Sequence, residues 1–187
     1  MKKTLMITTI ALLVLSALFS SCGEGEDVKV IGSTVSQSGS TTPDKTSYSS
    51  GGFVFEFNGA SVEMDALADP LIKQMGDNYE YFESASCAFD GKDKSYIYPH
   101  FELLTYPSKD GDRVQAIYLK DDLVTTKEGL YIGSPLADMQ RLYGEGTRSG
   151  NEYTFEKGGM ELKIQVTDDK VSYITYASMV LGTVTGQ

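Results

Sequence analysis

The first ordered stretch expected from the hydrophobic pattern is a hairpin over residues 53–64. Residues 53–57 place a phenylalanine at every second position, and residues 61–64 alternate apolar with polar side chains. Strict alternation is typical of a strand with one buried face. Asn58-Gly59 joins the two runs, and this dipeptide favours a two-residue type I′ turn. The pattern therefore predicts a tight antiparallel hairpin.

Two short helices are expected, each ended by a glycine. The first should cover about 66–75 and end at Gly76, because glycine readily takes the backbone conformation of a C-terminal cap. In the second, Ser134 is expected to cap the start, Pro135 to hold the first helical position and Gly144 to end the helix.

The remaining apolar runs alternate with a period of two and are separated by turn dipeptides such as Asp-Gly. Such alternation indicates sheets with one buried and one wet face, which are usually antiparallel. The pattern predicts an α+β fold, a mostly antiparallel sheet with both short helices on one face. The expected strands are 79–89, 95–106 and 113–120, followed by 152–156, 160–166 and 171–176.

The order of elements looks duplicated: a helix and three strands occur twice after the hairpin. Aligning Gly76 with Gly144 pairs the helices, and Val114 and Val171 each begin a strand just after a charged turn. The identity between the halves is low, so the duplication depends on element order. The two repeats would span about 65–121 and about 133–178.

Residues 1–21 have the layout of a secretory signal: Lys2 and Lys3 are followed by an apolar stretch and then by small residues. Cys22 follows directly, where a bacterial lipoprotein would carry its lipid. An uncleaved anchor, or ordinary cleavage leaving a free cysteine, remains open. Residues 22–52 are rich in Ser, Thr and Gly and predict a flexible tether, so one domain should cover 53–187.

Composition excludes some classes of binding partner and indicates how the domain is attached to the membrane. The 187 residues include 16 Lys and Arg against 26 Asp and Glu, giving a net charge of −10. This balance argues against nucleic-acid binding, which needs clustered cations, and against a basic membrane-binding patch. Acyl chains such as palmitate on Cys22 would then attach the domain to the cell membrane, facing outside the cytoplasm.

Short sequence segments of the chain resemble those of a known family. Tyr131–Leu136, ending at Tyr143-Gly144, is similar to the glycine-helix-glycine element of beta-lactamase-inhibitory-protein-like lipoproteins with a tandem-repeat fold. Two further segments resemble segments of lipoproteins from gut-type Firmicutes, namely Ser86–Gly91 and Thr126–Gly129. The resemblance implies a concave sheet that binds protein and no catalysis, and it transfers no contact residues.

Catalytic chemistry has few candidates. His100 is the single histidine, and a pair of Cys87 as nucleophile with His100 as base is conceivable because both fall on neighbouring expected strands. No local motif supports that pair, so a small buried thiol and a half-exposed histidine are favoured. The acidic clusters fall at turns and lack the residue spacing of a calcium-binding loop. A catalytic pair of carboxylates, as in glycosidases, remains an open alternative. No cofactor or metal is expected.

A tyrosine-rich strand face is the most informative candidate surface. Tyrosine suits interfaces because it offers a large area with a polar tip. If 95–106 is one strand, alternation places one set of side chains together on a face, and a neighbouring strand adds a further tyrosine. The expected binding residues are Tyr96, Tyr98, His100, Glu102, Tyr106 and Tyr118.

These observations predict a lipid-anchored, non-enzymatic module that binds a protein partner. A cell-wall glycan-binding or glycan-cleaving protein is the alternative, because aromatic platforms also stack on sugars, although the chain has no Trp. A purely structural role in the envelope also remains open.

Overall fold

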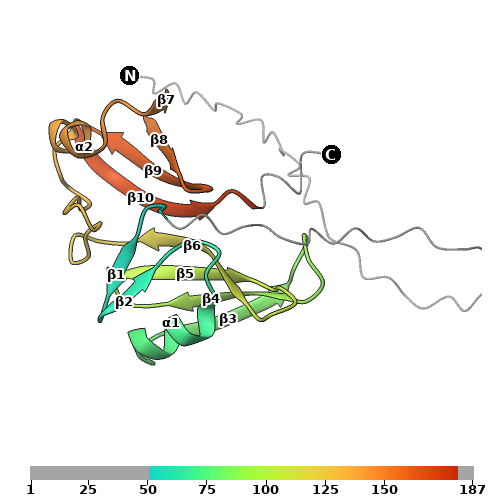
Figure 1. The fold of residues 1–187 in the computed structure, drawn as a ribbon. Coiled ribbons are helices and arrows are strands. Elements are labelled where there is room, and N and C mark those ends of the chain that lie inside the picture. The colour runs from blue at the N-terminus through green and yellow to red at the C-terminus, as the bar shows by residue number, and fades with distance from the viewer. Residues whose placement is uncertain (1–50, 181–187) are drawn as a thin grey trace, which may run out of the picture. The chain divides into compact units, whose positions relative to one another are not determined.

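The computed structural model describes residues 51–180, which form an α+β fold with a two-stranded and an eight-stranded antiparallel sheet (Figure 1). The large sheet has the order β3-β4-β5-β6-β10-β9-β8-β7. The expected signal segment, Cys22 and the tether lie outside the described residues. The elements are β1 (Phe55–Phe57), β2 (Ala60–Val62), α1 (Ala68–Met75), β3 (Glu80–Ala85), β4 (Lys92–Ile97), β5 (Phe101–Tyr106), β6 (Arg113–Leu119), α2 (Leu136–Tyr143), β7 (Thr147–Ser149), β8 (Glu152–Lys157), β9 (Met160–Thr167) and β10 (Lys170–Ser178).

The expected hairpin is confirmed. β1 and β2 pair antiparallel with Phe57 opposite Ala60, which leaves Asn58 and Gly59 as the two turn residues. Their φ angles are 48° and 81°, so both central residues are left-handed, as a type I′ turn requires. The amide of Asn58 also donates to the carbonyl oxygen of Met75 at 2.8 Å, which ties the turn to the end of α1.

The prediction of one strand over 95–106 is wrong. The chain forms β4 and β5 instead, joined by a turn around Pro99, and Ile97 pairs with Glu102 across it. Proline has no N–H to donate to a ladder, so it ends the strand before it. The turn also resets which side chains share a face. Because the run divides into β4 and β5, four strands follow α1 instead of the expected three. Four strands also follow α2, because the structure adds the unexpected β7.

The two helices end at glycines as expected, with the N–H of Gly76 donating to the Ile72 carbonyl at 3.1 Å and that of Gly144 to the Gln140 carbonyl at 2.8 Å. The expected cap at Ser134 is wrong. α2 has no side-chain cap, and the Ser134 hydroxyl accepts the N–H of Tyr131 at 3.1 Å. Ser134 is buried in the loop that precedes the helix.

One hydrophobic core joins the hairpin, both helices and one face of the large sheet. Ile72 and Met75 of α1 and Met139 of α2 belong to the same buried cluster as the inward side chains of the strands. Both helices therefore lie on the same face of the sheet. The strand residues in this core include Leu103, Ile117, Leu162, Ile164 and Tyr176.

The chain enters the two helices through the same set of backbone hydrogen bonds. Asp65 and Gly133, both with positive φ, donate N–H groups to the carbonyl oxygens of Val114 (2.8 Å) and Val171 (2.7 Å). Each valine donates back to the carbonyl oxygen of the next residue in the entering segment. The N–H of Val114 donates to the Ala66 carbonyl at 2.9 Å, and that of Val171 donates to the Ser134 carbonyl at 2.8 Å. A third equivalent pair of bonds follows, in which the N–H groups of Ala68 and Leu136 donate to the carbonyl oxygens of Asp112 and Asp169, both at 2.9 Å.

The β8–β9 turn provides a matched test of local packing. Gly158 and Gly159 have φ angles of 61° and 78°, so alanine is strained at either position. A Cβ on Gly158 would lie 2.6 Å from the backbone nitrogen of Gly52, whereas a Cβ on Gly159 meets nothing within 4 Å. We expect Gly158→Ala to lower the free energy of unfolding by at least about 1 kcal/mol more than Gly159→Ala, as measured by urea denaturation. Equal losses would show that the contact with Gly52 contributes nothing.

Candidate functional site

The predicted tyrosine-rich binding face does not exist as an exposed surface. Tyr96, Tyr98 and Tyr106 are buried, with 7%, 1% and 4% of their surface exposed. The physical reason is the turn at Pro99, which divides the run. Tyr96 then pairs opposite the buried Leu103 and points into the core.

The other predicted residues separate into two places. His100 lies in the β4–β5 turn, where its Nδ1 is 2.8 Å from Oδ2 of Asp121. Glu102 and Tyr118 are half-buried neighbours on β5 and β6, on the sheet face opposite the core. Of the predicted set, the structure brings only these last two together on an accessible face.

The conceivable pair of Cys87 and His100 is not formed. Cys87 is exposed in the turn before β4, and His100 follows the other end of that strand. β4 has six residues, which at about 3.3 Å per residue separates the two turns by roughly 20 Å. The hydrogen bond from His100 lowers the pKa of Asp121. This contact lies at the surface and does not include Cys87.

The sheet face opposite the core, which we call the open face, is crossed by rows of side chains from neighbouring strands. The helix and hairpin residues of the core cluster pack against the other face of the sheet. One row runs Phe82, Ser95, Leu104, Ala116, Ala177, Glu161 and Glu156. The next row runs Glu80, Ile97, Glu102, Tyr118, Thr175, Lys163 and Thr154.

A groove of about 500 Å³ lies on the open face where β6 and β10 meet. Tyr118 and Tyr173 contribute neighbouring rings, with centroids 6.1 Å apart and planes inclined at 32°. Tyr173 is 37% exposed, an unusual degree for a large side chain within a central strand. The other residues that line the groove are Glu102, Leu119, Lys120, Ile132 and Ser172.

The polar groups of this region are fixed by their neighbours. The Ser95 hydroxyl donates to Glu102 at 2.5 Å, and Lys163 donates to Glu161 at 2.7 Å, which raises the pKa of Lys163. Burial is the main cause that raises the pKa of Tyr118, followed by the nearby Tyr173 and Glu102. The tyrosine is therefore a neutral phenol at physiological pH. The arrangement offers ring surface, hydroxyl groups and a carboxylate for binding.

A second hollow, of about 550 Å³, lies beside α2 and is lined by Phe53, Tyr143 and Phe155 among others. The Tyr143 hydroxyl donates to Glu128 at 2.6 Å and lies 2.7 Å from Thr126 Oγ1. Burial and the bond to Glu128 raise the pKa of Tyr143. This phenol holds the loop before α2 against the helix.

Sequence reasoning missed Tyr173 and Lys163. Alternation does contain a signal for Tyr173, because Tyr173 and Tyr176 are three residues apart in one strand and must point to opposite faces. Tyr176 is fully buried, so Tyr173 faces outward. A bulge between Val171 and Tyr173 obscures this register in the sequence.

Within residues 51–180, no cluster of three or more His, Cys, Asp or Glu side chains is placed to hold a metal ion. In the same part of the chain, neither helix has the length and apolar character needed to cross a bilayer. Comparison with known protein families, curated proteins and solved structures gives no significant match to this chain.

Proposed function

We propose that this chain is a lipid-anchored, extracytoplasmic binding module that is not an enzyme and that binds a protein partner through its open face. The observation that carries the proposal is the groove at Tyr118 and Tyr173, where a half-buried and a partly exposed aromatic ring lie side by side on the two central strands of a large sheet. A central strand of a folded domain normally buries such rings, whereas interfaces are enriched in them.

The proposed anchor is the acylated Cys22, attached after removal of residues 1–21. Its support is the order of a basic start, an apolar stretch and small residues before the cysteine. With a net charge of −10 the chain is repelled by anionic lipids, so acyl chains must hold it at the membrane.

We expect Cys22→Ser to abolish labelling by palmitate and to move the protein from the membrane to the soluble fraction of the envelope. Cys87→Ser is the matched control, because that thiol belongs to the folded domain and should leave labelling and fractionation unchanged. Labelling that survives Cys22→Ser and disappears in Cys87→Ser would contradict the proposed anchor.

We further propose that the domain arose by duplication of a helix-plus-strands unit, as in the beta-lactamase-inhibitory-protein-like family that the sequence resembles. The three equivalent hydrogen bonds at the entry of each helix support this. In these bonds Asp65 is equivalent to Gly133, and Val114 is equivalent to Val171. The number of residues from Asp65 to the cap Gly76 equals the number from Gly133 to the cap Gly144. The observed units would each contain one helix and four strands.

The open face is tested by a pair of exposed tyrosines. Tyr173 lies in the groove, whereas Tyr131 is 42% exposed in the loop before α2. We expect Tyr173→Ser to weaken binding of the envelope partner at least about tenfold and Tyr131→Ser to leave it unchanged. The partner would be identified by cross-linking to wild-type protein, and its affinity for both variants measured by titration. Equal affinities for the two variants would contradict the proposed face.

A wall-glycan ligand is the second candidate, favoured by the two neighbouring rings and the adjacent Glu102, which could stack on a sugar and bind its hydroxyl groups. Binding of wall oligosaccharides that is lost in Tyr173→Ser, in the absence of any protein partner, would favour this candidate. Hydrolysis abolished by one carboxylate substitution would favour a glycan-cleaving enzyme.

A further inference from the structure

β3 is an accessible edge of the large sheet. Its six residues pair with β4 in an unbroken register, and β4 is its only partner strand among the described residues. Five of the six residues are exposed and the other is half-buried. The opposite edge, β7, has only three residues. Short edge strands, bulges and prolines usually prevent edges from pairing with another chain, and β3 has none of these protections.

The hydrogen-bond pattern shows which backbone groups of β3 point away from the sheet. The N–H of Ser86 donates to the Gly91 carbonyl at 3.0 Å, so Ser86 belongs to the residues that bond to the β4 side of the hairpin. In an antiparallel pair this property alternates along the strand. The N–H and C=O groups of Tyr81, Glu83 and Ala85 therefore point to the free edge.

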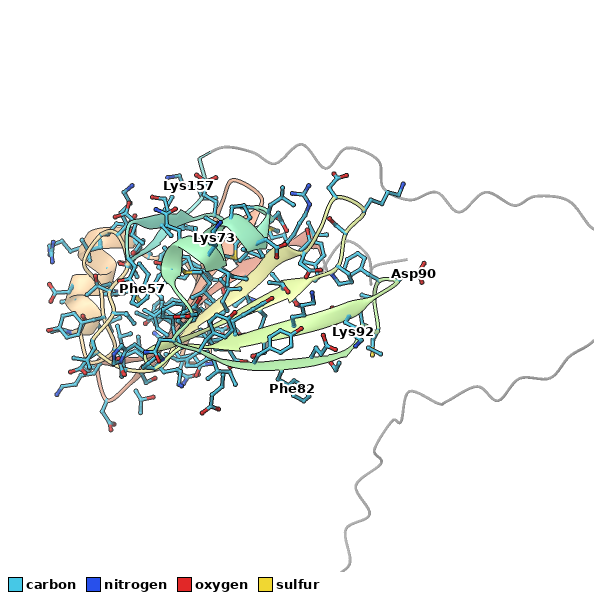
Figure 2. The ribbon with its side chains drawn as sticks, turned by 90° about the horizontal axis from the view of Figure 1, so that it is seen from below. Phe57, Lys73, Phe82, Asp90, Lys92 and Lys157 are labelled. Atoms are coloured by element: carbon cyan, nitrogen blue, oxygen red, sulfur yellow. The ribbon has the colours of Figure 1, made fainter. Side chains whose placement is uncertain are left out.

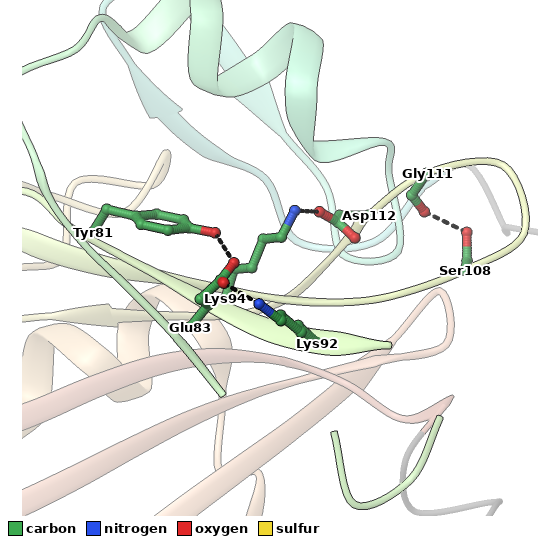
Figure 3. A network of polar contacts seen from close by, with 7 residues as sticks. All are labelled: Tyr81, Glu83, Lys92, Lys94, Ser108, Gly111 and Asp112. Carbon is green, nitrogen blue, oxygen red and sulfur yellow. Dashed lines mark hydrogen bonds and ion pairs between the residues drawn. The ribbon is translucent and has the colours of Figure 1, made fainter. Parts of the chain in front are cut away.

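Side-chain contacts hold β3 extended on its core-side face. The Tyr81 hydroxyl donates to Glu83 at 2.6 Å, and Lys92 of β4 is bound to the same carboxylate (Figure 3). The Tyr81 ring also lies against Tyr96, with centroids 5.3 Å apart. The free edge is thus fixed in the conformation that a further strand needs, so that little backbone entropy is lost when it pairs.

The other face of β3 offers an apolar contact. Phe82 is 63% exposed and projects from the border of the sheet (Figure 2). It begins the row of open-face side chains that continues through Ser95 to Leu104. A strand added beside β3 would cover this ring with one of its own side chains.

Charge selects what can bind at this edge. Both lysines near it are engaged, Lys92 with Glu83 and Lys94 with Asp112 at 2.6 Å. Among the described residues, neither Glu80 nor Asp93 takes part in an ion pair, so the edge keeps uncompensated negative charge. A second copy of this acidic chain would bring like charges to the seam, whereas a basic segment would find complementary charge.

We propose that β3 takes up an extended basic segment of the partner protein as a ninth strand of the sheet. The proposal rests on the protein-binding function above and places the backbone contact at the edge, apart from the groove at Tyr173. Main-chain hydrogen bonds to Tyr81, Glu83 and Ala85 provide affinity, while Phe82 and the carboxylates select the side chains.

Amide hydrogen exchange of the folded chain tests this with a synthetic hexapeptide of alternating Lys and Val as the probe. In the free protein, the amides of Tyr81, Glu83 and Ala85 should exchange faster than the intervening amides of β3. Adding the probe should slow exchange at these three positions. A peptide of alternating Glu and Val, and a Lys-Val peptide methylated on alternate peptide nitrogens, should each give at least about tenfold weaker binding.

Ala85→Pro and Ala85→Val form the matched pair of variants. Proline removes an outward N–H and leaves the bonds to β4 in place, while valine keeps the N–H with similar bulk. Ala85→Pro should weaken probe binding at least about fivefold and Ala85→Val should not, while Tyr173→Ser should leave probe binding unchanged. Equal binding of the Glu-Val peptide, or no protection at any probe concentration, would overturn the proposal. Protection that rises with protein concentration alone would also overturn it, because the occupant would then be a second copy.

Discussion

Replacing Tyr98 by Ala should destabilise the domain by about 3–5 kcal/mol, the usual cost of removing a buried aromatic side chain. The Tyr98 ring is 1% exposed and stacks on Phe101, with centroids 4.6 Å apart and planes at 15°. It also contacts Phe57 of the hairpin and Tyr79, so the substitution would loosen the packing between the hairpin and the sheet. Urea denaturation followed by circular dichroism measures this loss.

Tyr98→Phe separates the ring from its hydroxyl. The hydroxyl donates to the Gly76 carbonyl at 3.1 Å at the end of α1, and burial raises the pKa of Tyr98 to about 12. We expect Tyr98→Phe to cost about 1 kcal/mol, the net value of one such hydrogen bond. His100→Ala, which removes a half-buried hydrogen bond to Asp121 near the surface, should cost less than about 1 kcal/mol. A Tyr98→Ala variant as stable as His100→Ala would contradict the buried position of the ring.

Asp65 is the second position with a large expected effect, because it ties three distant segments together. Its Oδ1 accepts hydrogen bonds from the Tyr106 hydroxyl at 2.9 Å and from the Ser178 hydroxyl at 2.5 Å. Its carbonyl oxygen accepts a bond from Arg113 at 2.7 Å. Asp65→Ala would leave the two hydroxyls without this acceptor and place Ala at a φ of 64°, so we expect a loss of about 2–4 kcal/mol.

Asp65→Asn is the matched control. Both hydroxyl bonds end on a single oxygen, which the asparagine carbonyl can replace, and asparagine tolerates the left-handed backbone. We expect Asp65→Asn to retain most of the stability that Asp65→Ala loses. The free energies of unfolding of both variants, measured at one pH, check this. Equal losses would show that the two hydroxyl bonds contribute little.

The same pair of variants gives a pH dependence with a definite sign. Burial raises the pKa of Asp65 above its ordinary value, and the bonds from Ser178 and Tyr106 and the charge of Arg113 oppose this only in part. The folded state then holds the proton more tightly than the unfolded state, so this group's contribution to stability falls as pH rises through the raised pKa. Between about pH 3 and about pH 7, wild-type protein should lose stability relative to Asp65→Asn. A relative gain over that range would contradict the raised pKa.

The candidate site could be predicted only in part. Alternation correctly identified the strand at 113–120 that carries Tyr118, whereas Glu102 was assigned to one strand over 95–106 that the structure divides into β4 and β5. Both side chains lie on the open face. Tyr96, Tyr98 and Tyr106 were placed with them because the run was taken as one strand. The turn at Pro99 and bulges at Leu104/Thr105 and Val171/Tyr173 change the register, and each such change exchanges the faces of the residues beyond it.

The sequence by itself determined the local structure: the turn at Asn58-Gly59, the ends of both helices at glycines and the alternating strand expected at 160–166, which is β9. These features depend on residues a few positions apart, so short-range sterics and periodicity are sufficient to specify them. Only the tertiary structure decided which face of each strand is buried, that Tyr173 lies beside Tyr118 and that β3 is a free edge. Those properties depend on pairing between segments far apart in the chain, where burial of the common core fixes strand order and register.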